Sequence, residues 1–288
     1  MQICLIMDNP ETPNHPVIAV ALRRLSATHT VRMLDIRNLS ADEAMAQEAQ
    51  YPQADLYLLK SHAPQALALA HSLEEHGARV VNSWASSIAC QDRALMTQRM
   101  NEAHLPWPNT WSFTTLHEAL TQPTQLTALP LPLIVKSSYS HRGDLVAKVN
   151  SLAELQALSP QWDEEPIILQ EFAAGDGWDI KLWVIDQHIY AARRRTPLDP
   201  QAPKEDHPIP PEKLPADWLH ITREIGRVFN LRLYGVDLLL TTHGPVIVDV
   251  NSFPGFRGVP QADSALVTLV EQQLQEIAAC LADTAGRE

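Results

Sequence analysis

Cysteine is scarce in this chain. The three that are present, Cys4, Cys90 and Cys280, lie far apart and form no CxxC pair. So few cysteines favour a reducing cytosol and give no sign of a disulfide framework or a zinc site. Basic residues are also in the minority, with 22 lysines and arginines against 34 aspartates and glutamates, for a formal net charge of -12. This balance argues against a nucleic-acid partner.

Long apolar runs are missing as well. No stretch reaches the roughly 18 apolar residues that a membrane helix requires. The N-terminus also lacks the basic segment of a signal peptide. We therefore expect a cytoplasmic protein with no membrane partner. The 288 residues include only ten glycines and are 45% hydrophobic, which indicates an ordinary globular protein with a sizeable core.

The first hundred residues alternate strand-like and helix-like segments, with Gly77 as a helix C-cap. This alternation predicts a parallel α/β layer over residues 1–90. A single long helix is expected over 86–104, before the prolines of "LPWPNT". Strands are expected at 2–7, 29–36, 54–60 and 78–82, and helices at 17–27 and 64–77.

The pattern then changes to an α+β arrangement, with a central subdomain over 91–175 and a C-terminal subdomain over 176–288. Residues 197–215 hold seven of the 22 prolines and are expected to form an irregular loop, a candidate lid over the substrate. Antiparallel strands are expected at 132–138, 144–149, 166–172, 178–186 and 188–195, and helices near 216–229 and from 261.

Two acids and an amide in the last predicted hairpin are the strongest chemical signal. If "LYGVDLLLTT" and "VIVDVNSF" pair about His243, Asp237 lies opposite Asp249, and Asn251 projects from the same face. Two carboxylates so close repel each other unless a cation joins them. Hard oxygen ligands on rigid strands suit Mg²⁺ or Mn²⁺. The alternative is that Asp237 faces solvent while the other two form turn or capping bonds.

A metal held by carboxylates commonly works on phosphates, so a cationic clamp is expected elsewhere. Lys136 ends the apolar strand "PLIVK", and the following "SSYSHRG" supplies hydroxyls, Arg142 and Gly143 for a phosphate-covering loop. This segment lacks the spacing of a P-loop, and a strand-ending lysine is often simply solvated. Further candidate cations are Arg93, Lys181, Arg193 and Arg195, of which the last two share one strand face while Arg194 takes the other.

In this order the motifs resemble the ATP-grasp superfamily, and "YGVDLLLTTHGPVIVDVNSFPGFRG" is similar to the metal-binding ending of RimK-like ligases. The resemblance implies an ATP-grasp fold that follows a pre-ATP-grasp α/β domain. It also implies ATP and Mg²⁺ as cofactors, with Asp237, Asp249 and Asn251 as metal ligands. For ATP it implies contacts from Arg93, Lys136, Ser138, Arg142, Gly143, Gln170, Glu171, Phe172 and Asp179.

Within that set, 170–172 would meet the adenine, largely through backbone groups, and Asp179 would accept from the ribose hydroxyls. Arg93 stands where most members carry lysine, which keeps the charge and alters the geometry. On the acceptor side, Arg195 and Arg257 are the candidate catalytic residues, and both would also contact substrate. Further candidate substrate contacts are Lys60, Lys181 and Arg193. His62, next to Lys60, is expected to be a surface or capping residue.

The resemblance implies an ATP-dependent ligase that joins a carboxylate to an amine through an acyl-phosphate. The expected partner is a small-molecule or peptide substrate, and relatives suggest a possible homo-oligomer. "RRTPL" and "VDVNSFPGF" are also similar to ATP-grasp inositol polyphosphate kinases, so a kinase that phosphorylates a polyol is the alternative. A non-catalytic nucleotide-binding protein is a third possibility.

Overall fold

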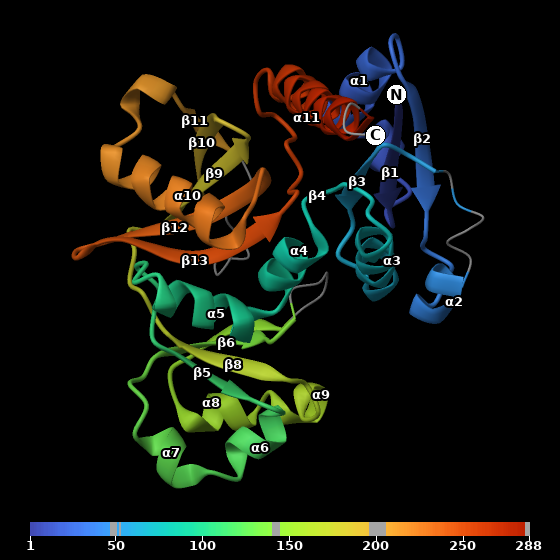
Figure 1. The fold of residues 1–288 in the computed structure, drawn as a ribbon. Coiled ribbons are helices and arrows are strands. Elements are labelled where there is room, and N and C mark those ends of the chain that lie inside the picture. The colour runs from blue at the N-terminus through green and yellow to red at the C-terminus, as the bar shows by residue number, and fades with distance from the viewer. Residues whose placement is uncertain (47–50, 52, 140–144, 196–205, 286–288) are drawn as a thin grey trace.

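The N-terminal part of the chain is a parallel α/β layer, as predicted (Figure 1). The computed structural model describes residues 1–46, 51, 53–139, 145–195 and 206–285. The four-stranded sheet has the order β2-β1-β3-β4, with every pair parallel. Its elements are β1 (Gln2–Met7), η1 (Thr12–Asn14), α1 (Pro16–Leu25), β2 (Thr30–Asp35), α2 (Ala41–Ala46), β3 (Leu56–Lys60), α3 (Pro64–Glu75) and β4 (Val80–Val81).

Both faces of this sheet are covered, which explains the nearly continuous apolar runs of β1 and β3. Alternate residues of β1 enter different cores. Ile3 and Leu5 pack in the cluster that contains α1, whereas Cys4 and Ile6 pack in the cluster that contains α3. Gly77, with φ of 84°, follows the end of α3 and takes the left-handed conformation that glycine adopts without strain.

The central part of the chain forms a separate antiparallel sheet with the order β5-β8-β6-β7. Short helices cover one side of it (Figure 1). The elements are β5 (Thr110–Phe113), α6 (Leu116–Leu120), α7 (Pro123–Thr127), β6 (Leu133–Ser137), β7 (Val146–Val149), α8 (Leu152–Gln156), α9 (Ser159–Trp162) and β8 (Ile167–Glu171).

A third, five-stranded sheet has the order β11-β10-β9-β12-β13. The expected hairpins β9–β10 and β12–β13 are both present. However, β8 pairs with β5 and β6 instead of β9, so the predicted run of successive strands over 166–195 is divided between two sheets. The elements are β9 (Trp178–Ile185), β10 (His188–Arg195), β11 (His207–Ile209), η3 (Pro211–Lys213), α10 (Ala216–Phe229), β12 (Leu233–Thr241), β13 (Gly244–Ser252) and α11 (Ala262–Ala285).

The helix expected over 86–104 is two helices, α4 (Trp84–Gln91) and α5 (Arg93–Glu102), so that prediction is wrong. The break is at Asp92, which has φ of -92° and ψ of 106°. Its carboxylate accepts hydrogen bonds from the backbone N–H groups of Ala94 and Leu95, 2.9 and 3.0 Å away. Aspartate is a favoured N-cap because it satisfies donors that the first turn leaves free.

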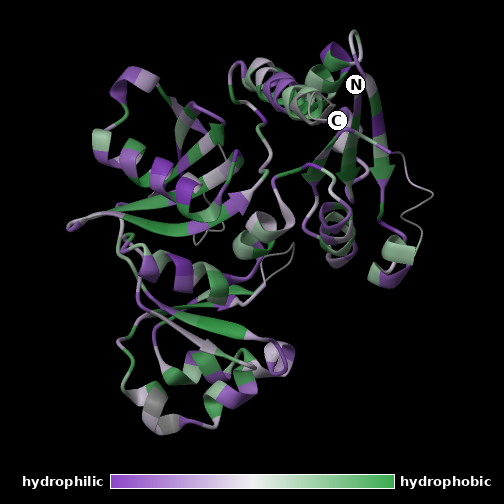
Figure 2. Ribbon diagram, viewed as in Figure 1, coloured by the Kyte–Doolittle hydropathy of each residue, from purple (hydrophilic) through white to green (hydrophobic). Residues whose placement is uncertain are grey.

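The C-terminal helix α11 packs against α1 of the N-terminal layer, although its residues follow the third sheet in the chain (Figure 1). Arg24 forms an ion pair with Asp263 at 3.0 Å, and His29 lies 3.1 Å from Glu271. Figure 2 shows apolar residues concentrated on the strands and polar residues on the outer helices. In the described residues no helix is both long and apolar enough to cross a membrane.

The predicted lid segment 197–215 lies partly outside the described residues, which resume at 206. Its described part contains β11, which adds to the edge of the third sheet by pairing with β10, and the short helix η3. A lid function for 197–215 stays a prediction.

Asn82 connects the N-terminal layer to the third sheet, and it is only 2% exposed. Its Nδ2 donates to the Leu233 carbonyl at 2.6 Å, and its Oδ1 accepts from the N–H groups of Arg232 and Leu233 at 2.9 and 3.1 Å. We expect Asn82→Ala to destabilise the protein by about 2–4 kcal/mol, because buried partners lose their hydrogen bonds. Urea unfolding tests this, with the exposed Asn38→Ala as control. Equal stability of the two variants would contradict it.

Candidate functional site

The hairpin of β12 and β13 brings the two predicted acids together. Asp237 pairs directly with Asp249, and Asn251 lies opposite Gly235. Because side chains alternate along each strand, all three polar side chains project from one face of the sheet. The predicted pairing of Asp237 with Asp249 is therefore confirmed, although the turn is not centred on His243 as expected, since Thr241 pairs with Gly244.

A β-bulge produces this register. Thr241 pairs with Gly244 at the turn, so a regular hairpin would place Val248 opposite Asp237. The register shifts by one residue after Asp237, which puts Asp249 in that position instead. The bulge keeps both carboxylates on one face and re-aims the backbone of Val248.

The environment of Asp249 fits a bound cation. Its Oδ1 is buried and has no hydrogen-bond partner among the described residues, while Oδ2 accepts from Asn251 Nδ2 at 3.3 Å. Burial raises the pKa of Asp237, against the influence of Lys181, and the Asp249 carboxylate raises it further. A buried carboxylate oxygen without a donor is costly, and a hard divalent ion satisfies it.

No group of three or more His, Cys, Asp or Glu side chains in metal-binding arrangement exists in the described part of the chain. A cation here would therefore use two carboxylates, the Asn251 amide oxygen and oxygens from outside the protein. That donor set suits an ion such as Mg²⁺, which keeps water or phosphate oxygens.

Lys181 lies opposite Asp237 on β9, and its Nζ donates to Asp237 Oδ2. This lysine was predicted to contact substrate. In the structure it is an ion-pair partner of one of the two acids, 18% exposed, and lines neither of the two cavities described below.

Lys136 is buried on β6, where it bridges the two antiparallel sheets. Its Nζ donates to Gln170 Oε1 and to the carbonyl of Val248, the bulge residue, both at 2.9 Å. Burial lowers the pKa of Lys136 to about 8. A buried ammonium with two neutral acceptors is incompletely compensated, and a polyanion would stabilise it.

Arg93, the first residue of α5, is 5% exposed and lies against the end of β6. Its guanidinium donates to the Ser137 carbonyl at 2.8 Å, and its backbone N–H donates to the Ser138 carbonyl at 2.8 Å. Ser138 is 7% exposed. The other predicted phosphate-loop residues, Arg142 and Gly143, lie outside the described residues.

A cavity of about 170 Å³ separates the central and third sheets at this point. It gathers most of the residues predicted for ATP, together with both acids. The lining residues are Arg93, Pro108, Ile134, Lys136, Val146, Gln170, Glu171, Phe172, Ala173, Asp179, Asp237, Leu239, Val248 and Asp249.

The end of β8 forms one wall of this small cavity. The Gln170 amide is occupied on both sides, because it accepts from Lys136 and donates to Thr110 Oγ1 at 3.0 Å. Glu171 accepts from the Asn109 amide at 2.8 Å, and the Lys148 ammonium lies 3.8 Å from the ring centroid of Phe172. The side chains at 170 and 171 are thus engaged within the protein, and the backbone N–H of Glu171 also donates to the Asn109 carbonyl at 2.8 Å.

Arg193 and Arg195 do not join this site. Arg195 pairs with Trp178 and Arg193 with Ile180, so both project from the face opposite to Asp179 and the metal-type acids. The guanidinium carbon of Arg193 lies 4.9 Å from the ring centroid of Trp178, and that of Arg195 lies 4.0 Å from it. The expectation that these two arginines flank the acceptor is not met by this placement.

Arg194 projects from the site face, since it pairs with Asp179 on β9. Its guanidinium donates twice to Asp206, with both distances 2.6 Å. This hydrogen-bonded pair raises the pKa of Arg194, and Asp237 and Asp179 contribute at longer range. Strict alternation already separated Arg194 from its neighbours, but only the pairing with β9 identifies which face meets the acids.

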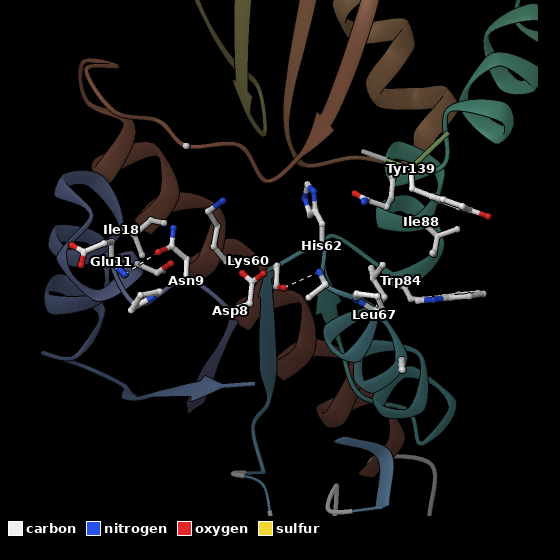
Figure 3. Close-up of a pocket in the computed structure, with 18 of the residues that line it drawn as sticks. Asp8, Asn9, Glu11, Ile18, Lys60, His62, Leu67, Trp84, Ile88 and Tyr139 are labelled. Carbon is white, nitrogen blue, oxygen red and sulfur yellow. Dashed lines mark hydrogen bonds between the residues drawn. The ribbon is translucent and has the colours of Figure 1, made fainter. Parts of the chain in front are cut away.

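A second, larger cavity of about 1370 Å³ lies beside the N-terminal layer. Lys60 and Arg257, two of the predicted substrate contacts, both line it. In Figure 3, Asp8, Asn9, Glu11 and Lys60 lie on one side of His62, and Leu67, Trp84, Ile88 and Tyr139 lie on the other.

In two parts of the chain, residues close together in sequence line different cavities. Gln91 lines the large cavity and Arg93 the small one, on either side of the break between α4 and α5. Asp249 lines the small cavity, and Gly255 and Arg257, just beyond β13, line the large one.

The end of β3 holds the loop that follows β13. Lys60 Nζ donates to the Phe253 carbonyl at 2.6 Å, and His62 Nε2 lies 2.7 Å from the Ser252 carbonyl. Because a carbonyl only accepts, Nε2 of His62 carries the proton. Burial lowers the pKa of His62, which fits this neutral form. The expectation of a surface or capping histidine was wrong, since His62 joins two parts of the molecule.

Comparison with known proteins identifies the family. A model of the RimK-like ATP-grasp domain matches residues 90–272, more than half of the chain. This chain belongs to the RimK-like ATP-grasp family. Membership implies that it binds ATP, and the small cavity lies entirely within the matched segment.

Curated relatives are similar to this chain over part of their length. The "Probable alpha-L-glutamate ligase 2" of Hahella chejuensis is 30% identical over 137 residues, 46% of this chain and 45% of that protein. The "Probable alpha-L-glutamate ligase" of Thioalkalivibrio sulfidiphilus is 28% identical over 152 residues, 49% of this chain and 50% of that protein. The chain thus spans about half the length of the curated relatives it matches.

Solved structures share the fold over nearly the whole chain. A RimK domain ATP-grasp protein from Sphaerobacter thermophilus has a TM-score of 0.74 at 19% identity, covering 93% of this chain and 98% of its own. D-alanine--D-alanine ligase from Bacillus anthracis, complexed with ATP, has a TM-score of 0.68 at 18% identity, covering 97% and 99%. The predicted mixed α/β and α+β class and the ATP-grasp fold are confirmed.

Proposed function

We propose that this RimK-like protein is an ATP-dependent ligase that joins a carboxylate to an amine through an acyl-phosphate. The observation that carries the proposal is the small cavity between two sheets. There the buried Lys136 ammonium donates to the carbonyl of Val248, the bulge residue. Asp249 is the next residue along the same strand. Cationic and metal-type groups on facing walls of one narrow space are what a triphosphate requires.

The end of β8 and Asp179 would bind the nucleoside. The side chains of Gln170 and Glu171 are engaged in the protein, and the backbone N–H of Glu171 donates to the Asn109 carbonyl, so the adenine edge would meet the backbone of Phe172, just after β8. Asp179, 4% exposed and lining the same cavity, would accept from ribose hydroxyls. Lys136 and Arg93 would contact the phosphates.

Asp237, Asp249 and Asn251 would hold Mg²⁺ or Mn²⁺, as the uncompensated Asp249 oxygen favours. When bound, such an ion supplies positive charge to phosphate oxygens. Lys181 would keep the Asp237 carboxylate charge-balanced, since it already forms an ion pair with Asp237. Arg194 would add positive charge on the same face if it released Asp206.

The proposed reaction has two steps. A substrate carboxylate oxygen attacks the γ-phosphorus of ATP, the bond from that phosphorus to the bridging oxygen breaks, and ADP leaves. A neutral amine then attacks the acyl carbon, phosphate leaves with the former carboxylate oxygen, and the nitrogen gives up a proton to water. Lys136 and Arg93 offset the negative charge in the first step, so positioning and electrostatics carry the catalysis.

Neither of the two buried cysteines suits covalent catalysis, and the exposed Cys280 lies on α11 and lines neither cavity. Cys4 and Cys90 are buried, and burial raises the pKa of Cys4 to about 12 and that of Cys90 further. A thiol nucleophile needs a lowered pKa and access to the substrate.

The large cavity would bind the acceptor. Its lining pairs two cations, Lys60 and Arg257, with two acids, Asp8 and Glu11. An inositol phosphate would be repelled by the acids, whereas an amino acid or peptide carries both charges. This balance favours the ligase over the kinase.

A screen for ADP release tests the proposal. The wild-type protein is incubated with Mg-ATP and with acids, amines and inositol phosphates, singly and in pairs. We expect ADP release only where a carboxylate and an amine are both present. Release with inositol phosphates alone would identify the kinase, and ATP binding without turnover across the panel would identify a non-catalytic nucleotide-binding protein.

A further inference from the structure

The large cavity has two unlike ends. One end carries the charged groups Asp8, Glu11, Lys60 and Arg257, contributed by the end of β3 and by the loops that follow β1 and β13. The other end is built from α3 and α4 and is largely apolar (Figure 3). The charged end accounts for recognition of a zwitterion, but it gives no reason for the apolar end.

A stripe on α4 forms the apolar end. Trp84 and Ile88 are four residues apart, so their side chains neighbour each other on one face of the helix. Both are partly exposed, and Leu67 of α3 continues the wall. Trp84 is held in place, because its backbone N–H donates to Glu74 at 3.1 Å and its ring lies 4.1 Å from the His71 ring.

Gln91 ends this stripe with a polar group that lacks a partner. It lies seven residues after Trp84, on the same helical face, and lines the same cavity. The residue is 7% exposed, and its Oε1 is buried with no hydrogen bond from any described residue. A buried acceptor beside an apolar wall is costly to the free protein and is satisfied by a ligand N–H.

The size of the cavity indicates more than one amino acid. Its volume of about 1370 Å³ exceeds the roughly 300–1,000 Å³ that is usual for drug-sized ligands. A short peptide would extend from the charged end to the α4 stripe, and peptide bonds supply the N–H donors that Gln91 requires.

We infer that Trp84, Ile88 and Gln91 form a specificity subsite for a short zwitterionic peptide with a bulky apolar side chain. The side chain packs on Trp84 and Ile88, a backbone N–H donates to Gln91 Oε1, and the charged end holds the terminal carboxylate and ammonium. This inference deepens the proposed ligase function, on which it rests, by naming one substrate class.

Equilibrium binding of dipeptides tests the subsite without any need for turnover. By calorimetry in the presence of Mg-ADP, Gly-Phe is expected to bind the wild-type protein roughly 10- to 100-fold more tightly than Gly-Gly, since an aromatic side chain is buried. Equal affinities, or binding of neither dipeptide, would overturn the inference.

Two variants locate the effect. In Trp84→Ala the preference for Gly-Phe over Gly-Gly is expected to fall close to one, and in Gln91→Leu both dipeptides are expected to bind roughly tenfold more weakly. Trp162→Ala, which removes a partly buried tryptophan from the central subdomain, should keep the wild-type preference. If Trp84→Ala lacks a cooperative thermal transition, Ile88→Ala is used in its place. A folded variant that keeps the full preference for Gly-Phe over Gly-Gly would overturn the subsite.

A separate readout distinguishes this subsite from the ligase reaction. ADP release is measured with Gly-Phe and an amine or a second acid. Selective binding of Gly-Phe that depends on Trp84, without ADP release from any pair, would support the subsite and contradict the ligase. ADP release with Gly-Gly and Gly-Phe at equal kcat/KM would support the ligase and overturn the subsite.

Discussion

Asp249→Asn is expected to lower ATP-dependent turnover by at least about 1000-fold. Removal of one preorganised electrostatic contact to a transition state costs about 100- to 1000-fold, and this change also removes a charged ligand for a divalent ion. The substitution keeps the size of the side chain, and Asp249 Oδ1 has no hydrogen-bond partner among the described residues that would be lost. The measurement is ADP release with the best substrate pair at saturating ATP.

Asp263→Asn is the matched control, because Asp263 lies on α11 in an ion pair with Arg24, away from the cavities. It should retain wild-type turnover. Thermal unfolding of Asp249→Asn should stay close to that of the wild type, and the magnesium dependence of ATP affinity should flatten. Wild-type turnover in Asp249→Asn would remove this residue from the proposed metal site.

Only part of the arrangement of the metal-type residues follows from local sequence. Alternation along β13 places Asp249 and Asn251 on one face, but Asp237 shares that face only because the register shifts at the bulge. The bulge at Val248 was not predictable in the same way. It changes the register by one residue, and only the observed pairing shows that the bulge carbonyl accepts from Lys136.

The acceptor side was less predictable because it depends on contacts distant in sequence. The pairing of β10 with β9 determines that Arg194 projects from the same face as the acids. Arg193 and Arg195 project from the opposite face. Lys60 was identified from a resemblance, but its hydrogen bond to Phe253 spans 193 residues. The break at Asp92 did have a local signal, since an aspartate directly before a helical segment is a favoured N-cap.

Substitution of Lys136, near the end of β6, is expected to have the second large effect, on ATP affinity. Lys136→Met is expected to weaken ATP binding by roughly 10- to 100-fold, since a hydrogen bond to a charged group contributes about 1.5–3 kcal/mol. Methionine preserves the apolar stem within a buried site that is 8% exposed, so the fold should persist. Isothermal titration with Mg-ATP at pH 7 measures the difference. The exposed Lys213→Met is the control and should bind ATP as the wild type does.

The pH dependence separates loss of the charge from loss of shape. Burial lowers the pKa of Lys136 to about 8, so the free protein carries the ammonium below that pH and loses it as the pH rises. ATP binds the charged form preferentially, and wild-type affinity should therefore fall by up to about tenfold per pH unit above pH 8. Lys136→Met has no proton to lose at this position and should show no such decline. If both proteins follow the same profile, the ammonium is not a phosphate contact, and the facing walls of the small cavity lose their main source of positive charge.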